Sequence, residues 1–142
     1  MPVCYQNHWT LYVINKNYEQ IDILDSLANK KYHYSIAGAV RTKLSAVISL
    51  VAKEHPDFSG WSLPSVPSLP QQEKSLDSAF CVMMFMRHYN PDSHKLEFFE
   101  LGADWKSGEL RIDNLWYLIH HKLNGSRDTL PEGIIQDHGS SP

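Results

Sequence analysis

An α+β fold is predicted from the order of elements along the chain, which runs from two strands through a helix and a short strand to two further helices. The chain has 142 residues, of which 42% are hydrophobic and 20% charged. A chain of this size buries about two-thirds of its unfolded surface, and no internal repeat or interior low-complexity linker divides it. We therefore expect one domain over residues 1–125 and a flexible tail over 126–142, where Pro, Gly and Ser leave little to bury.

The first two strands are predicted to form a β-hairpin. Segments 9–14 (WTLYVI) and 21–24 (IDIL) mix aromatic and β-branched residues, which favour extended backbone. The polar segment 15–17 (NKN) between them is typical of a turn. A further, interrupted strand is expected at a sheet edge over 60–66, because the prolines around it exclude a helix. These prolines are Pro56, Pro64, Pro67 and Pro70.

The first helix is predicted over residues 35–53, with Ser35 as its N-cap and His55-Pro56 as its stop. Its apolar residues recur at steps of four, three, one and three, so they share one helical face. This face should pack on the sheet. It consists of Val40, Leu44, Val47, Ile48 and Val51.

Two further helices complete the predicted fold. Segment 78–89 (SAFCVMMFMRHY) is apolar all round, which favours a helix buried on most sides, with Asp77 capping or preceding its N-terminus. A last helix is predicted over 109–122, where 124–125 (NG) supplies an end signal. The apolar residues that share a face of this helix are Leu115, Leu118 and Ile119.

Composition excludes several function classes. With 13 Lys and Arg against 16 Asp and Glu, the net charge is −3, so nucleic acid is not an expected partner. The longest apolar stretch, 79–86, is far shorter than the roughly 20 residues that cross a membrane, so we expect neither a membrane span nor a charged-then-apolar leader. Cys4 and Cys81 cannot form a disulfide framework. An intracellular protein, cytoplasmic or nuclear, is expected.

Three residues could form a catalytic triad. His8 precedes the first strand and Asp25 follows the second, so the hairpin would bring a carboxylate beside an imidazole. Ser78 opens the buried helix, where backbone N–H groups and the helix dipole favour a developing anion. Each residue also has a structural interpretation: a satisfied histidine, an aspartate that begins a turn, and a serine that caps a helix. The residues alone leave both interpretations open.

Other candidate groups have a simpler interpretation. Cys81 lies three residues beyond Ser78 inside a hydrophobic segment and is expected to be a structural thiol, although it could replace Ser78 as nucleophile. Cys4 and His8 are only two potential ligands, so neither a metal nor a cofactor is expected.

Two further groups are assigned to surface and core. The adjacent histidines His120 and His121 are interpreted as solvated surface. A methionine cluster is interpreted as core filling. Its members are Met83, Met84 and Met86.

Three stretches resemble the SUMO-protease family of ubiquitin-like-protein cysteine proteases. They are 8–14 (HWTLYVI), 23–27 (ILDSL), and 69–72 (LPQQ) leading to 77–80 (DSAF). Order and spacing both agree, because Asp25 lies 17 positions after His8 and the proposed nucleophile lies six positions after Gln72. The resemblance implies a papain-like or adenain-like cysteine protease core, a small sheet packed by helices.

The resemblance also implies a role for each matched residue. His8 would be the general base, Asp25 its orienting carboxylate and Gln72 the oxyanion-hole side chain. Trp9 would form one wall of the passage that holds a diglycine tail. Two departures stand out: Ser78, followed by an alanine rather than a glycine, replaces the catalytic cysteine, and only seven residues stand where the family has an N-terminal helical part.

The replacement of cysteine by serine predicts a loss of catalysis. A cysteine thiol has a pKa of about 8.5 and readily becomes a thiolate, whereas a serine hydroxyl is far less acidic. We therefore expect a catalytically inactive domain, a pseudoprotease, that binds a protein partner such as a ubiquitin-like protein. One alternative is an active isopeptidase in which Ser78 is an engineered cysteine replacement, or in which Ser78 itself acts as the nucleophile. A second is a regulator or antidote that binds and neutralises another protein.

Overall fold

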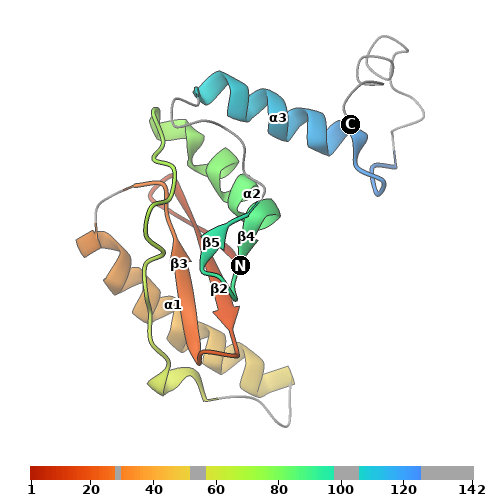
Figure 1. Cartoon of the computed structure of the whole chain (residues 1–142). Coiled ribbons are helices and arrows are strands. Elements are labelled where there is room, and N and C mark those ends of the chain that lie inside the picture. Colours follow the sequence, from red (N-terminus) through yellow and green to blue (C-terminus); the bar gives the residue numbers. More distant parts are fainter. Residues whose placement is uncertain (28–29, 52–56, 98–105, 126–142) are drawn as a thin grey trace.

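The computed structural model describes residues 1–27, 30–51, 57–97 and 106–125. A three-stranded antiparallel sheet is formed by β1 (Pro2–Tyr5), β2 (His8–Asn15) and β3 (Gln20–Leu24), in that order. The helices are α1 (Lys30–Val51), α2 (Ser78–His88) and α3 (Ser107–His120). Two 3-10 turns, η1 (Phe58–Gly60) and η2 (Ser75–Asp77), and a small hairpin of β4 (Tyr89–Asn90) and β5 (Lys95–Leu96) complete the described elements (Figure 1).

The predicted hairpin is confirmed as β2 and β3, and strand β1 precedes it. The turn between β1 and β2 consists of Gln6 and Asn7, both with positive φ (48° and 62°), the geometry that two-residue hairpins favour. Sequence analysis missed β1 because it is mostly exposed and shows no apolar alternation. The sheet therefore begins almost at Met1.

The sheet separates two hydrophobic clusters, as the alternation of side chains along a strand requires. Tyr12, Ile21 and Ile23 face α1 and pack with its residues and with η1. Leu11 and Leu24 face the other way and pack with α2 and α3. A strand with apolar residues on both faces must be covered twice, which explains helices on either side (Figure 1).

The predicted interrupted strand is confirmed along the edge of β3 that does not pair with β2. Isolated parallel bridges join Gln20 to Ser62 and Ile23 to Ser65. Pro64 cannot donate a backbone hydrogen bond, but its carbonyl accepts one from the Ile23 amide at 2.8 Å. The prolines thus limit this segment to single bridges rather than a continuous strand.

Helix α1 begins earlier than predicted. It starts at Lys30, so Ser35 is not its N-cap; the preceding segment 30–34 contains no glycine or proline to prevent helix formation. The expected stop at 55–56 lies outside the described residues. Val40 is buried, whereas Val47 and Val51 at the end of the predicted face are exposed.

Helix α2 follows the prediction closely. It ends at His88 rather than at 89, because Tyr89 is already extended and begins β4. Asp77 precedes the helix but makes no side-chain capping bond. Met84 is buried in the core as predicted, but Met86 is 60% exposed, so core filling is wrong for that residue.

Helix α3 buries a different face from the predicted one. Leu110 and Asn114 are fully buried, whereas Leu115 and Leu118 are exposed. Residues 124–125 lie beyond the helix end, although the Asn124 side chain does bond the Ile119 carbonyl at 2.8 Å.

The two histidines at the end of α3, His120 and His121, both contact aromatic side chains and are not simply solvated. His120 is half-buried and stacks on Trp116, and His121 lies against Tyr117. The predicted tail over 126–142 lies outside the described residues. None of the described helices combines the length and apolar character that a membrane span requires.

Candidate active site

His8 and Asp25 come together where β2 begins and β3 ends. His8 is the first residue of β2, and Asp25 comes directly after β3, the strand that pairs antiparallel with β2. His8 Nε2 lies 2.8 Å from Asp25 Oδ1, and both side chains are buried. An ionised carboxylate can only accept, so Nε2 carries the hydrogen of this bond.

Asp25 is held by two more donors. Thr10 Oγ1 donates to Oδ2 at 2.7 Å, and the Leu27 amide donates to Oδ1 at 2.7 Å. Burial alone would raise the pKa of Asp25, but hydrogen bonds from His8, Thr10 and Leu27 outweigh burial and lower it. The carboxylate therefore stays ionised and can stabilise a protonated imidazole.

The two ring nitrogens of His8 have different surroundings. Because Asp25 occupies Nε2, Nδ1 is the nitrogen that could take a proton from a nucleophile. Serine proteases use the ring the other way round, with the carboxylate on Nδ1 and the serine on Nε2. A nucleophile for this histidine must therefore approach from the side of its own main chain.

Ser78 lies on that side of His8. It is the first residue of α2 and only 1% exposed, and its Oγ accepts a hydrogen bond from the Trp9 amide at 3.2 Å. Among the hydrogen bonds of the described residues, none joins this hydroxyl to the imidazole. The N-terminus of a helix supplies partial positive charge at this point.

The start of α2 is fixed by an ion pair between a buried aspartate and a partly exposed arginine. Asp77 is fully buried, and its Oδ1 accepts from Arg111 Nε at 3.0 Å and Nη2 at 2.5 Å. The other oxygen accepts from the Lys74 amide at 3.2 Å. Because Arg111 belongs to α3, the position of Ser78 depends on the docking of that helix.

Gln72 is anchored next to Asp25 by Ser26. The Gln72 amide donates to the Ser26 carbonyl at 3.0 Å, and Ser26 Oγ donates to Gln72 Oε1 at 2.7 Å. Gln72 Nε2, the atom that an oxyanion would need, donates to the Lys74 carbonyl at 3.1 Å. The side-chain amide is thus held within the loop that leads to α2.

Sequence reasoning missed Thr10 and Ser26. Thr10 is two positions after His8 on β2, so strand periodicity places both on one face. Ser26 directly follows Asp25. Their positions close to His8 and Asp25 in the sequence could have indicated a contact with these residues. The residue types Thr and Ser alone do not specify a hydrogen-bond partner.

The remaining candidates have clear positions. Trp9 is 38% exposed on the opposite face of β2 from His8. Cys4 pairs with Trp9 across the sheet, so Cys4 and His8 project to opposite faces rather than toward a shared ion. Burial, opposed by a hydrogen bond from Ser26, raises the pKa of Cys81 to about 11, so this thiol stays protonated at neutral pH.

An α+β core that sets a histidine–carboxylate pair against the N-terminus of a buried helix has the layout of a nucleophilic hydrolase. Residues 1–103 match the family described as "Ulp1 protease family, C-terminal catalytic domain". The chain belongs to this family, which confirms the resemblance at family level.

Individual relatives agree with this assignment. The "Putative ubiquitin-like-specific protease 1B" of Arabidopsis thaliana is 28% identical over 90 residues, which are 63% of this chain and 26% of that protein. The structure of the SUMO protease Ulp1 with its catalytic cysteine oxidized to a sulfenic acid has a TM-score of 0.56 at 24% identity, covering 81% of this chain and 50% of that chain.

A second solved structure is the C-terminal Ulp1 protease domain in complex with Smt3, the yeast ortholog of SUMO. Its TM-score is 0.51 at 25% identity, covering 69% of this chain and 42% of that chain. These similarities confirm the predicted α+β fold. The chain spans about a quarter of the curated relative and half or less of the solved chains.

Proposed function

We propose that this chain is a pseudoprotease, a Ulp1-family domain that binds a ubiquitin-like protein without cleaving it. The hydrogen bonding of Ser78 carries the proposal. Its Oγ is 3.2 Å from the Trp9 amide nitrogen and, within the described part of the chain, is not hydrogen-bonded to His8. A serine hydroxyl attacks only when a base removes its proton during the reaction.

The different acidities of a hydroxyl and a thiol explain why hydrolysis by Ser78 would need a hydrogen bond to His8. Ulp1 uses a catalytic cysteine, and a thiolate formed before attack does not require proton transfer during attack. For Ser78 the transfer to His8 Nδ1 would have to occur in the transition state. A loss of about 4 kcal/mol of stabilisation there slows hydrolysis about a thousandfold.

The binding partner is inferred from the family and from the surface beside Ser78. The related Ulp1 domain was solved in complex with Smt3. In this chain Trp9 exposes 38% of its surface next to the residue that its amide contacts. A flat aromatic surface at this place suits the narrow, small-residue tail of a ubiquitin-like protein.

Hydrolysis is tested with a fluorogenic SUMO conjugate on the unsubstituted chain and on Ser78→Cys. We expect no turnover above background for the unsubstituted chain and measurable turnover for Ser78→Cys, because the thiol restores a preformed nucleophile. Turnover by the unsubstituted chain that equals the turnover of an active Ser78→Cys would refute a pseudoprotease.

Binding is tested by calorimetric titration with Smt3, the yeast ortholog of SUMO. We expect saturable binding that Trp9→Ala weakens about tenfold or more, a loss of about 1.4 kcal/mol or more. Leu50→Ala is the matched control, since Leu50 is 84% exposed on α1. Absence of saturable binding would remove the ubiquitin-like partner from the proposal.

A serine hydrolase is the second candidate, and the intact His8–Asp25 pair favours it. Labelling by a fluorophosphonate separates the two functions, because this reagent modifies only an activated serine. The hydrolase requires labelling that disappears in Ser78→Ala. The pseudoprotease requires that the natural chain remain unlabelled.

A further inference from the structure

No described strand pairs with the outer edge of β1. Met1 and Tyr12 exchange two backbone hydrogen bonds, at 2.7 and 2.9 Å. Such pairs alternate along an antiparallel ladder, so Val3 also bonds to β2 while Pro2 and Cys4 point their backbone groups outward. Within the described part of the chain β1 is the last strand of its sheet. Its edge thus offers one N–H donor, from Cys4, and two carbonyl acceptors.

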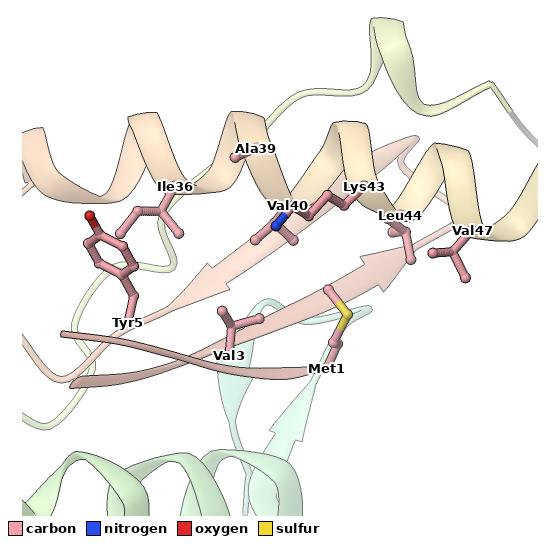
Figure 2. Close-up of a pocket in the computed structure, with 9 residues that line it drawn as sticks. All are labelled: Met1, Val3, Tyr5, Ile36, Ala39, Val40, Lys43, Leu44 and Val47. Carbon is pink, nitrogen blue, oxygen red and sulfur yellow. The ribbon is translucent and has the colours of Figure 1, made fainter. Parts of the chain in front are cut away.

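An apolar groove of about 530 Å³ lies between this strand and α1. Figure 2 shows side chains from β1 and α1 converging on it. Every second residue of the β1 segment contributes, and α1 contributes residues at helical spacing. The main lining residues are Met1, Val3, Tyr5, Ile36, Val40 and Leu44. Since Met1 and Tyr5 are nearly half exposed, the groove is open to solvent.

A single charged side chain lies along the groove. Of the described residues that line it, Lys43 alone has a charged side chain. Figure 2 shows this side chain running from α1 toward Val40, so that its nitrogen lies between the Tyr5 end and the Val47 end of the groove. A ligand that fills the groove would therefore be apolar along most of its length and would carry one acidic side chain between its apolar ones.

We propose that the β1 edge and this groove together bind an extended segment of a partner protein as an additional strand. Alternate side chains of the segment would be apolar and enter the groove, and an acidic side chain would face Lys43. Its backbone would bond the outward groups of Pro2 and Cys4, as strands added to open sheet edges do.

Other occupants fit these observations less well. A small apolar molecule would leave the outward backbone groups of β1 without partners. A second copy of this chain would offer its own β1, but residues 1–5 (MPVCY) contain no acidic side chain to face Lys43. A separate acidic, apolar strand satisfies the edge, the groove and the charge together.

The probe is a fluorescein-labelled peptide, TFTETVTV, compared with the charge-reversed TFTKTVTV. Fluorescence anisotropy should show saturable binding of the acidic peptide, and at least about fivefold weaker binding of the basic one, at low salt. Lys43→Glu should reverse this preference.

Two substitutions on α1 form a matched pair. Val47→Asp adds a charge to an exposed residue that lines the groove and should weaken binding about tenfold or more. Leu50→Asp adds the same charge to an exposed residue outside the groove and should leave binding unchanged. Both positions are exposed, so neither variant should prevent folding.

Methylation of the peptide amides tests the strand geometry. Because alternate amides of a strand point to one side, methylating one alternate set should abolish binding and methylating the other should not. Trp9→Ala should have no effect, since Trp9 lies on the opposite face of the sheet, and this separates the groove from the proposed ubiquitin-like site. No saturable binding up to about 1 mM, or binding insensitive to both Val47→Asp and Lys43→Glu, would overturn the proposal.

Discussion

Two buried aspartates, Asp22 in the middle of β3 and Asp25 directly after this strand, have different chemical surroundings. Asp25 lies 2.8 Å from His8, close to the N-terminus of α2. Asp22 is fully buried on the other face of β3, and the nearest imidazole nitrogen, Nδ1 of His94, is 3.6 Å away. A buried Asp–His pair is therefore not enough to define a catalytic site.

The donors around each carboxylate explain the difference. Asp22 accepts from Gln20 Nε2 at 2.6 Å, from Tyr89 OH at 2.9 Å and from Asn15 Nδ2 at 3.2 Å. Tyr89 begins β4, so this network fastens the small hairpin to the sheet. Burial, followed by the hydrogen bond and charge of Asp22, raises the pKa of Tyr89, which keeps the phenol a donor. Asp22 therefore joins β4 to the sheet, whereas Asp25 holds the imidazole of His8.

The largest expected difference between Asp25 and Asp22 is in the rate of hydrolysis by a Ser78→Cys chain. In a Ser78→Cys chain, Asp25→Ala should lower kcat/KM about ten-thousandfold, as loss of a triad carboxylate does. Asp22→Ala should change kcat/KM less than about threefold, because Asp22 does not contact the base. The measurement is hydrolysis of a fluorogenic SUMO conjugate, at a temperature where circular dichroism shows both proteins folded. Equal losses would mean that the two aspartates are not functionally distinct.

For the free energy of unfolding we expect the opposite order, with the larger loss at Asp22. Asp22→Ala leaves three donors without their acceptor in a buried site and should lower the free energy of unfolding by about 3 kcal/mol. Urea denaturation measures this loss. Asp92→Ala is the control. Within the described residues the Asp92 carboxylate accepts one exposed bond, from Asn17 Nδ2 at 3.2 Å, so its loss should cost less than about 0.5 kcal/mol. A loss below about 1 kcal/mol for Asp22→Ala would contradict the structural function.

Thr10 should have a smaller effect at the other carboxylate. Thr10→Val keeps the shape of the side chain but removes the 2.7 Å hydrogen bond to Asp25 Oδ2, at a cost of about 1 kcal/mol. Thr10→Ser retains the hydroxyl and should recover most of this stability. Identical urea midpoints for the Val and Ser variants would show that the hydrogen bond contributes nothing measurable.

The smallest expected effect is a change in how the free energy of unfolding depends on pH under acidic conditions. The pKa of Asp25 in the folded state lies below its unfolded value of 3.8. The ionised carboxylate therefore stabilises the fold above that pH, and the stabilisation is lost as the pH falls through the folded-state pKa. Asp25→Asn should flatten the dependence of the urea midpoint on pH between about 5 and about 2. An unchanged slope would show that other groups govern acid unfolding.

Local patterns predicted the parts of this molecule in which the signal lies within one segment. The β2–β3 hairpin, α2 and the pairing of His8 with Asp25 follow from alternation, apolar runs and short-range spacing. The network around Asp22 was not predicted, because Tyr89 is 67 residues away and polar residue types do not specify their partners.

Exposed elements were the other source of error. Strand β1 is fixed by a two-residue turn without glycine, at Gln6 and Asn7, which the sequence does not signal. The packed face of α3 was misassigned because Leu115 and Leu118 outnumber the apolar residues that are buried, while the buried face includes Asn114. Periodicity identified the helix but not the side that packs.

The ion pair between Asp77 and Arg111 sets the order in which the candidate site can assemble during synthesis. The hairpin with His8 and Asp25 leaves the ribosome before α2 and α3. The residue that anchors the start of α2, however, is encoded more than thirty positions after Ser78. A nascent chain stalled before Arg111 would already hold its histidine and carboxylate but would lack the side chain that fixes the start of α2, so the site is completed only after α3 has been synthesised.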